Sequence, residues 1–455
     1  MTLAPPLPPP LALPPRRTPP PPRRALSPVW PVVAVVALLG LPSVTGGAGG
    51  AGPADALSAL VVGFCAVRLL RRRRRPLSAT AVLVLALPVV GLAVAAVGAS
   101  SAGAGLTGLG RYLQIFVLVP VAVALLIRDR SDVRLLAWAF VALAAWEGAV
   151  GVHQYATGTG ASYQGQLIRA VGTFGAQDIM GMATVVSLGL VCATGLALGD
   201  GPARQRALAT AAALALTVPL ALSFSRGAWI ATALTCAAQL LLAGARRALA
   251  VGAGLLAAGI VLVGGLGVGS GMLQERISSI GRVAAAPDQS VTDRYAMWAA
   301  AGAMWREHPV TGVGLKGFPE HRDAHAPLAL SSGSDTESAG EAFRRQPLLS
   351  PHNMYLLILA EQGLLGLLAL AGSWLALLVR SLTRLRHTRR TGPARRAPDC
   401  ALLATGLLIW QLIDFCYADI GGPATVLSGV CLGLTAWWAL SAARPPATGG
   451  HDDRA

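Results

Sequence analysis

The chain has 455 residues, of which 54% are hydrophobic and only 13% are charged. Soluble globular proteins carry roughly 25% charged residues, so this composition excludes an ordinary water-soluble domain. The net charge of +16 raises nucleic acid as a partner, but the placement of the basic residues along the chain argues against it.

The N-terminal segment, residues 1–28, is dominated by proline and arginine. Thirteen prolines lie between residues 5 and 31, together with Arg16, Arg17, Arg23 and Arg24. This composition predicts a disordered, polyproline-type cytoplasmic tail and not a cleavable signal sequence. We expect the C-terminal residues 443–455 to form a second disordered cytoplasmic tail.

Apolar runs near twenty residues long fill residues 29–268 and 354–442. A helix of this length crosses a bilayer. Because lipid offers no hydrogen-bond partners, a spanning segment must pair its backbone N–H and C=O groups within a helix or a closed barrel. Because the runs are continuous and not alternating, they predict helices. We expect an all-α integral membrane protein with about twelve transmembrane helices, at residues 29–46, 55–70, 78–99, 112–127, 133–152, 176–198, 206–223, 227–244, 248–268, 354–379, 400–418 and 423–442.

The arginines predict the orientation of these helices. Basic residues stay on the cytoplasmic side, and most of them fall in alternate connections, such as Arg71–Arg75 and the stretch 380–396. This pattern places both termini in the cytoplasm and makes the protein a multi-pass component of the plasma membrane. The basic charge then serves membrane topology and contact with anionic lipids, with no role in binding nucleic acid.

One connection is much longer than the others. Residues 269–353 form a single large external loop between the ninth and tenth helices, and residues 153–175 form a smaller one. Within the large loop, residues 291–307 read as an amphipathic helix whose start carries a capping box, Ser290 with Asp293. Its Tyr295, Trp298 and Trp305 share one face, which can pack on the bilayer interface or on the helix bundle.

Four side chains on the external side carry the candidate chemistry: Arg169, Arg226, Arg294 and His352. A guanidinium suits a diphosphate because it makes paired hydrogen bonds to phosphate oxygens and stays charged. A histidine can accept the proton of an attacking hydroxyl. The competing interpretation is that each arginine pairs with a nearby acid or a lipid headgroup.

Other polar features give weaker predictions. His321, Asp323 and His325 have spacing that suits a metal, but Pro319 and Pro327 flank the segment and favour a solvated loop, so we predict no metal site. The glycines of GVGLKGF, residues 312–318, can form a phosphate-binding nest. The six cysteines lie in or beside apolar runs and predict no disulfide framework or metal cluster.

Three acids fall inside predicted helices, near their external ends: Glu147, Glu361 and Asp414. Ionisable residues inside a membrane are candidates for functional sites. They can pair with the external arginines or line a polar cavity, or the helix boundaries can be displaced by one turn. The sequence leaves their roles open.

The external segments, taken in order, resemble the O-antigen ligase and O-antigen polymerase superfamily. The matching pieces are RAVGTFG (169–175), FSRGAW (224–229), DRYAMW (293–298), HPVTGVGLKGF (308–318), PHNMYL (351–356) and EQGLLG (361–366). The resemblance covers roughly residues 165–380. Family members often have an asparagine shortly after the GTF segment, where this chain has Gln177 and Asp178, and this leaves the role of Asp178 open.

The resemblance implies a metal-independent membrane glycosyltransferase of the GT-C type that needs no cofactor. Such an enzyme moves a glycan from undecaprenyl diphosphate to the hydroxyl of a glycan or lipid acceptor, on the extracytoplasmic face. By the resemblance, Arg226 and Arg294 hold the diphosphate, His352 assists the acceptor, and Arg169 is a further substrate-binding residue. A diphosphate is already a good leaving group, so fixed positive charge can replace a metal ion.

The rival interpretation is a secondary transporter of a small solute, since twelve helices with both ends inside also describe many carriers. Carriers are commonly built from internal repeats with interrupted helices. We find no convincing repeat in this sequence. The sequence does not distinguish ligase from polymerase, nor does it identify the sugar, the acceptor, the linkage or the oligomeric state.

Overall fold

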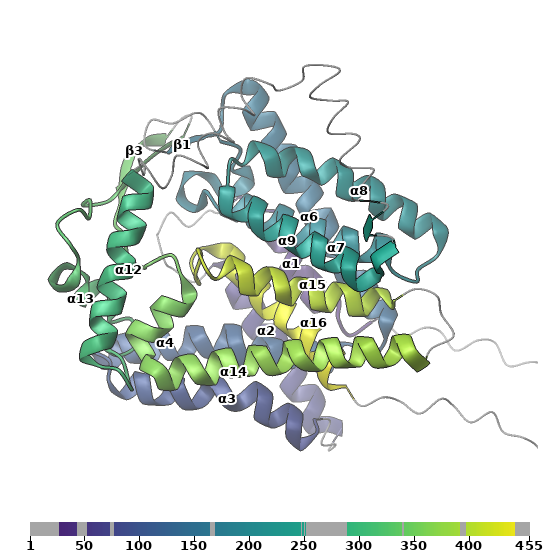
Figure 1. Ribbon diagram of the computed structural model, residues 1–455, viewed down its shortest axis with the longest axis horizontal. Coiled ribbons are helices and arrows are strands. Elements are labelled where there is room, and N and C mark those ends of the chain that lie inside the picture. The colour runs from purple at the N-terminus through teal and green to yellow at the C-terminus, as the bar shows by residue number, and fades with distance from the viewer. Residues whose placement is uncertain are drawn as a thin grey trace, which may run out of the picture.

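The computed structural model describes residues 27–42, 52–72, 77–163, 169–246, 248–249, 251, 289–338, 341–391 and 397–441. The two predicted tails, the ninth predicted helix (248–268) and the start of the large loop lie outside these ranges, entirely or nearly so. The described part is a bundle of long helices with a cap of short elements at one end (Figure 1). Nine helices are long and apolar enough to cross a membrane, within the described residues.

These membrane-crossing helices reproduce most of the predicted spans. They are α2 (Pro53–Arg72), α3 (Ala79–Val97), the continuous run of α4 (Ala102–Leu113), η1 (Gln114–Leu118) and α5 (Val119–Leu126), α6 (Arg130–Thr157), α7 (Gly181–Leu198), α8 (Ala203–Leu222), α9 (Arg226–Ala243), α14 (Met354–Thr391), and the last span, formed by η4 (Pro423–Thr425) and α16 (Val426–Leu440). The multi-helix membrane fold is thereby confirmed. The exact number of twelve helices and the cytoplasmic position of the termini stay predictions.

Four predicted spans differ clearly from the structure. The tenth, 354–379, ends twelve residues too early, since α14 continues to Thr391. The first, 29–46, is the helix α1 (Trp30–Leu38), whose nine residues extend about 14 Å and do not cross a bilayer alone. The eleventh is α15 (Asp399–Asp414), a sixteen-residue helix of about 24 Å. The fourth begins ten residues earlier than predicted, because Gly105 and Gly108 pack closely enough on neighbouring segments to keep a glycine-rich stretch helical.

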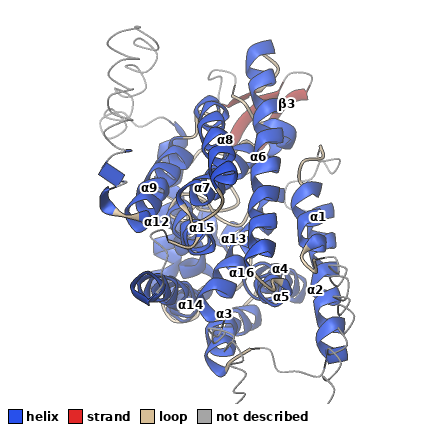
Figure 2. Ribbon diagram, turned by 90° about the vertical axis from the view of Figure 1, so that its right-hand side faces the viewer, coloured by secondary structure: helices blue, strands red, loops and turns tan. Residues whose placement is uncertain are grey.

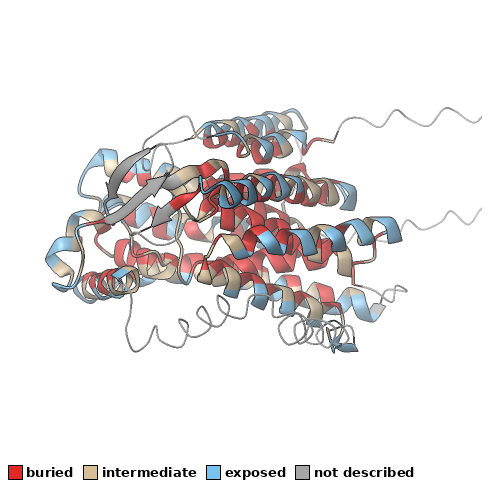
Figure 3. Ribbon diagram, turned by 90° about the horizontal axis from the view of Figure 1, so that it is seen from above, coloured by how far each residue is buried: buried red, intermediate tan, exposed pale blue. Residues whose placement is uncertain are grey.

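Three helices lie at the centre of the bundle, and the other helices surround them (Figure 2). Of the eighteen-residue apolar stretch in each helix, 78% is buried in α7 and 83% in the last span, which contains α16. The corresponding fractions are only 28% in α2 and 22% in α8. Thirteen of the sixteen residues of α15 are also buried. Buried residues gather inside the bundle, and exposed ones lie on its outer helices (Figure 3). We infer that α7, α15 and α16 form the centre, and that α2 and α8 present apolar side chains to lipid.

A small antiparallel sheet joins the two loops that were predicted to be external. Strand β1 (Ala161–Tyr163) of the smaller loop pairs with β2 (Ser334–Ser338) of the large loop, which pairs with β3 (Glu341–Gln346). The large loop also contains α12 (Gln289–Glu307) and α13 (Phe318–His325). The sheet departs from the all-α expectation, and it holds both loops at the same end of the bundle (Figure 1).

The predicted loop helix is confirmed as α12, but its predicted capping box is wrong. The helix already includes Ser290, and the Asp293 carboxylate accepts hydrogen bonds from the Ser331 amide (2.8 Å) and hydroxyl (2.7 Å). This carboxylate therefore ties α12 to the loop before β2. The face of α12 that packs on the bundle consists of alanine and methionine residues, and not of the aromatic stripe.

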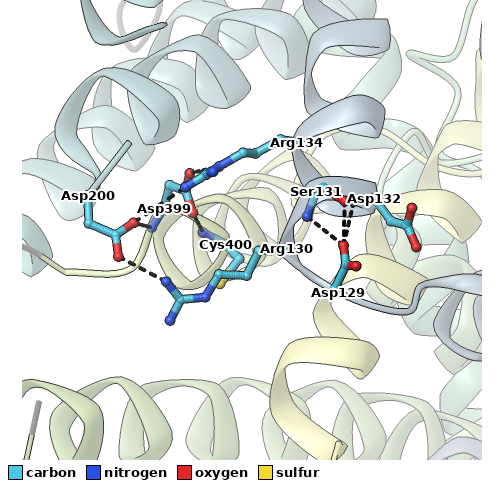
Figure 4. A network of polar contacts seen from close by, with 8 residues as sticks. All are labelled: Asp129, Arg130, Ser131, Asp132, Arg134, Asp200, Asp399 and Cys400. Carbon is cyan, nitrogen blue, oxygen red and sulfur yellow. Dashed lines mark hydrogen bonds and ion pairs between the residues drawn. The ribbon is translucent and has the colours of Figure 1, made fainter. Parts of the chain in front are cut away.

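At the opposite end of the bundle, an ion-pair network joins three helices (Figure 4). Arg130 contacts Asp200 at 2.9 Å, and Arg134 contacts the fully buried Asp399 at 2.5 Å. The network therefore connects the start of α6, the segment after α7 and the start of α15. The opposite ends of these helices lie near the loops. By fixing α6, α7 and α15 relative to one another, the network therefore also fixes the helix ends that carry the loop elements.

Helix α14 is interrupted near its start, and a loop segment fills the interruption. Gly363 has φ +62°, and the amides of Leu364 and Leu365 donate to the carbonyls of Pro309 and Val310 instead of to their own helix. In return, the Val313 and Gly314 amides donate to the carbonyls of Ala360 and Glu361. A broken helix at membrane depth requires such partners, because lipid offers none.

Replacing Gly363 with alanine is expected to destabilise the protein strongly. A Cβ atom there would lie 2.3 Å from the Val310 main chain, at a positive φ that alanine adopts only with strain. We expect a loss of at least about 2 kcal/mol, measured by thermal unfolding in detergent. The matched control in the same helix is Gly372→Ala, where a Cβ has ordinary contact at 3.6 Å. Equal stability of the two variants would contradict this account of the break.

Candidate functional site

The residues that end α15 form a short turn, 414–419, at the end of the bundle that carries the loops. The Asn353 side-chain amide donates to the Cys416 carbonyl at 2.7 Å, and the Met354 amide donates to the carbonyls of Phe415 and Ala418. The segment that precedes α14, with His352, is therefore held directly against this turn. We call residues 414–419 the α15 turn.

The start of α9, which carries Arg226, packs against the same turn. Ser225 caps this helix through its hydroxyl, which accepts from the Ala228 amide, and Arg226 is the first helical residue. The Gly227 carbonyl accepts a hydrogen bond from the Tyr417 hydroxyl, and a Cβ at Gly227 would lie 2.3 Å from the Tyr417 ring. Only glycine allows α9 to approach the turn this closely, so Gly227 fixes the position of its neighbour Arg226.

Arg294 reaches the turn from α12. Its guanidinium donates to the Tyr417 carbonyl at 3.4 Å. Tyr417 thus contacts both arginine-bearing helices, with its hydroxyl toward α9 and its carbonyl toward α12. Arg294 itself contacts the six-residue α15 turn, while Arg226 and His352 are placed there by the residues that follow them, Gly227 for the first and Asn353 and Met354 for the second. The three predicted site residues, which are 68 and 58 residues apart along the chain, therefore lie around one turn.

His352 is half-buried between charges of opposite sign. Burial lowers the pKa of the imidazole, and the nearby Arg294 guanidinium lowers it further, whereas the Asp419 carboxylate raises it. The net pKa lies below the usual value of about 6.5, so the ring is neutral at pH 7. A neutral imidazole can accept a proton, which is what the predicted role requires.

Asp419 and Tyr417 are the two residues of the cluster that sequence reasoning missed. One carboxylate oxygen of Asp419 is fully buried and has no hydrogen-bond partner among the described residues. Both residues lie in the short connection that follows α15, where no recognisable motif marks them. The one signal in the sequence was the acidic residue Asp419 in the short connection between the last two predicted helices.

Arg169 lies in a neighbouring part of the same loop cap. Its amide and carbonyl pair with Ala161, and the adjacent Ala170 amide donates to Leu222 at the end of α8, four residues before Arg226. The RAVGTFG segment therefore borders the FSRGAW segment.

The buried acids of the helices anchor these motif segments. Glu147 accepts from the Thr173 amide (2.8 Å) and hydroxyl (2.7 Å), and Glu361 accepts from the Tyr112 hydroxyl (3.3 Å) and the Phe318 amide (3.4 Å). Asp414 interacts with Tyr417 in the α15 turn. These acids were predicted as candidate site residues, and their described contacts fix the loops that carry the site.

Asp178 is the last residue of the short helix η2 (Gly172–Asp178), just before α7 and outside the membrane-crossing segment. Burial raises the pKa of its carboxyl to about 6, against hydrogen bonds from the Gly181 and Met180 amides that lower it. Gly422, with φ +72°, packs against this carboxylate. Asp178 therefore links the GTF turn to the connection that follows the α15 turn.

Three non-glycine residues with a left-handed backbone occur among the described residues: Phe224, Lys316 and His352, with φ values of +50°, +63° and +47°. Each belongs to one of the motif segments that resemble the O-antigen ligase superfamily. Such conformations cost free energy and persist where the surroundings enforce them, often at functional sites. The distribution of strain therefore coincides with the segments that sequence analysis singled out.

The glycine run 312–318 does not offer a phosphate nest. The amides of Val313, Gly314 and Leu315 donate to Ala360, Glu361 and Ala95 within the protein. A Cβ at Gly312 or Gly314 would lie within 2.4 Å of neighbouring main-chain atoms. These glycines allow close packing on the interrupted α14, and the prediction of an anion-binding role is wrong.

The histidines of α13 also have partners within the protein. The His321 ring contacts the Gly317 carbonyl at 2.9 Å, and the His325 ring contacts Glu307 at 2.9 Å. Among the described residues, no three His, Cys, Asp or Glu side chains come together as a group able to hold a metal ion. These contacts indicate that the two rings stabilise α13.

A hollow of about 400 Å³ lies at the far end of α12, lined by Gly98, Ser100, His308, Gly312, Val313 and His321. His308 is fourteen residues from Arg294, which corresponds to about 21 Å along a helix. This hollow is therefore distinct from the cluster on the α15 turn.

Comparison with known proteins gives one family. Residues 211–371 match the family described as O-antigen ligase. The match runs from α8 into α14 and includes Arg226, Arg294 and His352, while Arg169 and the α15 turn lie outside it. No curated protein matches the chain.

Proposed function

We propose that this chain is a member of the O-antigen ligase and polymerase superfamily and transfers glycan from a lipid diphosphate to an acceptor hydroxyl. The match of residues 211–371 to the family described as O-antigen ligase supports this proposal. The family supports a membrane glycosyltransferase of polysaccharide assembly. The donor, undecaprenyl diphosphate, and the location of the site on the extracytoplasmic face are part of the proposal. The observation that carries it is that Arg294 and the residues next to Arg226 and His352 all bond to the single α15 turn.

The chemistry follows from the charges of this cluster. The acceptor oxygen attacks the anomeric carbon of the lipid-linked sugar, and the bond from that carbon to the diphosphate oxygen breaks. His352 accepts the proton of the acceptor hydroxyl, and the carboxylate of Asp419 stabilises the imidazolium that forms. The departing diphosphate takes the electron pair, and Arg226 and Arg294 stabilise its negative charge.

The position of Arg226 adds to this stabilisation. The N-terminus of a helix carries a partial positive charge, and Arg226 is the first residue of the eighteen-residue helix α9. Arg226 thus brings its own charge to a helix end that already favours anions. This placement suits the leaving group better than the neutral acceptor.

The proposal is tested with purified protein and radiolabelled undecaprenyl-diphosphate glycan from the native cells. We expect covalent transfer of the label to an acceptor glycan without added metal. The same protein in proteoliposomes tests the rival transporter function. Uptake of free sugar without covalent transfer would support a carrier and overturn the proposal.

A further inference from the structure

Two aromatic side chains of α12 lie directly beside the cluster on the α15 turn. Tyr295 follows Arg294 and is 53% exposed, and its ring meets the Trp298 ring edge-on at a centroid distance of 5.6 Å. The Trp298 indole donates a hydrogen bond of 2.8 Å to the carbonyl of Pro351, the residue before His352. Both rings are thereby held next to the predicted arginine and histidine.

Packing does not account for the position of Tyr295. The face of α12 that is buried against the bundle consists of Asp293, Ala296, Met297, Ala300, Ala301 and Met304. Trp298 lies one helical turn from Arg294 and so shares its face. Tyr295 contacts Trp298, and Trp298 is bonded to the residue before His352, so the pair lies beside both predicted site residues.

A role in anchoring α12 to the bilayer fits this helix poorly. An interfacial helix needs a broad stripe of exposed bulky apolar residues. All of α12 is described, and Tyr295 is the one bulky apolar side chain that is strongly exposed on it, beside Ala299, Arg306 and Glu307. A single fixed ring is suited to contact one ligand group and not to hold a helix in lipid.

We propose that Tyr295 and Trp298 form a saccharide subsite for the sugar next to the diphosphate. A pyranose ring has an apolar face of C–H groups and a rim of hydroxyls. An aromatic ring held rigidly by its neighbours matches such a face, and the tyrosine hydroxyl stays near the polar rim. Because Arg294 is adjacent to Tyr295, a diphosphate on Arg294 would bring its first sugar onto these rings. The inference rests on the proposed function.

The test compares two lipids bound to the full-length protein in nanodiscs. The probes are undecaprenyl diphosphate without sugar and the undecaprenyl-diphosphate oligosaccharide extracted from the native cells. We expect Tyr295→Ala to weaken binding of the glycan-bearing lipid about three- to tenfold and to leave the sugar-free lipid unchanged. Tyr295→Phe, which keeps the ring, should bind both lipids like the wild type. Val310→Ala is the control, because Val310 is also strongly exposed in this loop.

The outcomes separate this subsite from the proposed function. Equal weakening of both lipids by Tyr295→Ala would identify a lipid or headgroup contact and overturn the subsite. Unchanged binding of the glycan-bearing lipid would also overturn it. If the wild-type protein bound neither lipid, the proposed function would fail and the subsite with it, whereas the first two outcomes leave the proposed function intact.

Discussion

Replacement of Arg226 or Arg294 by alanine is expected to lower kcat/KM for glycan transfer by about 10² to 10³. Each guanidinium is proposed to bind the diphosphate as its negative charge grows, and removing one fixed donor from such a site costs about this factor. Lysine at either position should recover part of the loss, since it restores the charge but not the paired hydrogen bonds. Initial rates of transfer from the lipid-linked glycan measure the effect.

Arg306 provides the matched control for Arg294. It lies at the other end of α12, is exposed, and contacts only the Gly302 carbonyl of its own helix among the described interactions. Arg306→Ala should keep transfer within about twofold of the wild type, as expected for a surface change. If Arg306→Ala and Arg294→Ala lost activity equally, the loss would reflect a general effect on the loop. The diphosphate assignment would then be wrong.

The double variant of Arg226 and Arg294 tests whether both residues act on one group. Residues that serve the same leaving group are strongly non-additive, so the double variant should lose less than the product of the two single losses. Purely multiplicative losses would indicate two independent sites. The non-additive result is the expected one, because Tyr417 bonds both to Arg294 and to Gly227, the residue after Arg226.

Replacement of His352 by glutamine is expected to lower kcat by about 10² to 10⁴, the usual contribution of a positioned general base. The wild-type rate should fall as the pH drops through the lowered pKa of His352, because the protonated ring cannot accept a proton. In the glutamine variant this acidic limb should vanish. His308→Gln, on an exposed residue after α12, should leave both rate and pH profile unchanged.

Asp419→Asn tests the charge that faces His352. The carboxylate raises the pKa of His352, so its removal should shift the acidic limb to lower pH. The plateau rate should also fall, since the imidazolium loses its counter-charge and the ring becomes a weaker base. The exposed Asp323, on α13, supplies the control Asp323→Asn. An acidic limb that stays in place in Asp419→Asn would show that Asp419 does not act on His352.

The sequence alone determined the class of fold and the side chains worth testing. Long apolar runs predict membrane helices because lipid leaves few ways to satisfy a backbone, and this constraint acts locally. The motif segments singled out Arg226, Arg294 and His352. Each of these residues lies in a predicted external segment, and such segments contain few basic side chains. Neither inference depended on knowing which helices are neighbours.

Tertiary contacts decided what the sequence left open. Gly108 packs on Leu315 and Gly363 on Val310, which are far away in the chain, so helix propensity alone misplaced the start of α4 and gave no sign of the break in α14. Tyr417 and Asp419 gain their importance from helices α9, α12 and α14, which meet at the α15 turn although more than a hundred residues separate α9 from α14. Contacts between residues so far apart in the chain leave no periodic pattern in the sequence. They depend on how the helices pack against one another and not on neighbouring residues in the chain.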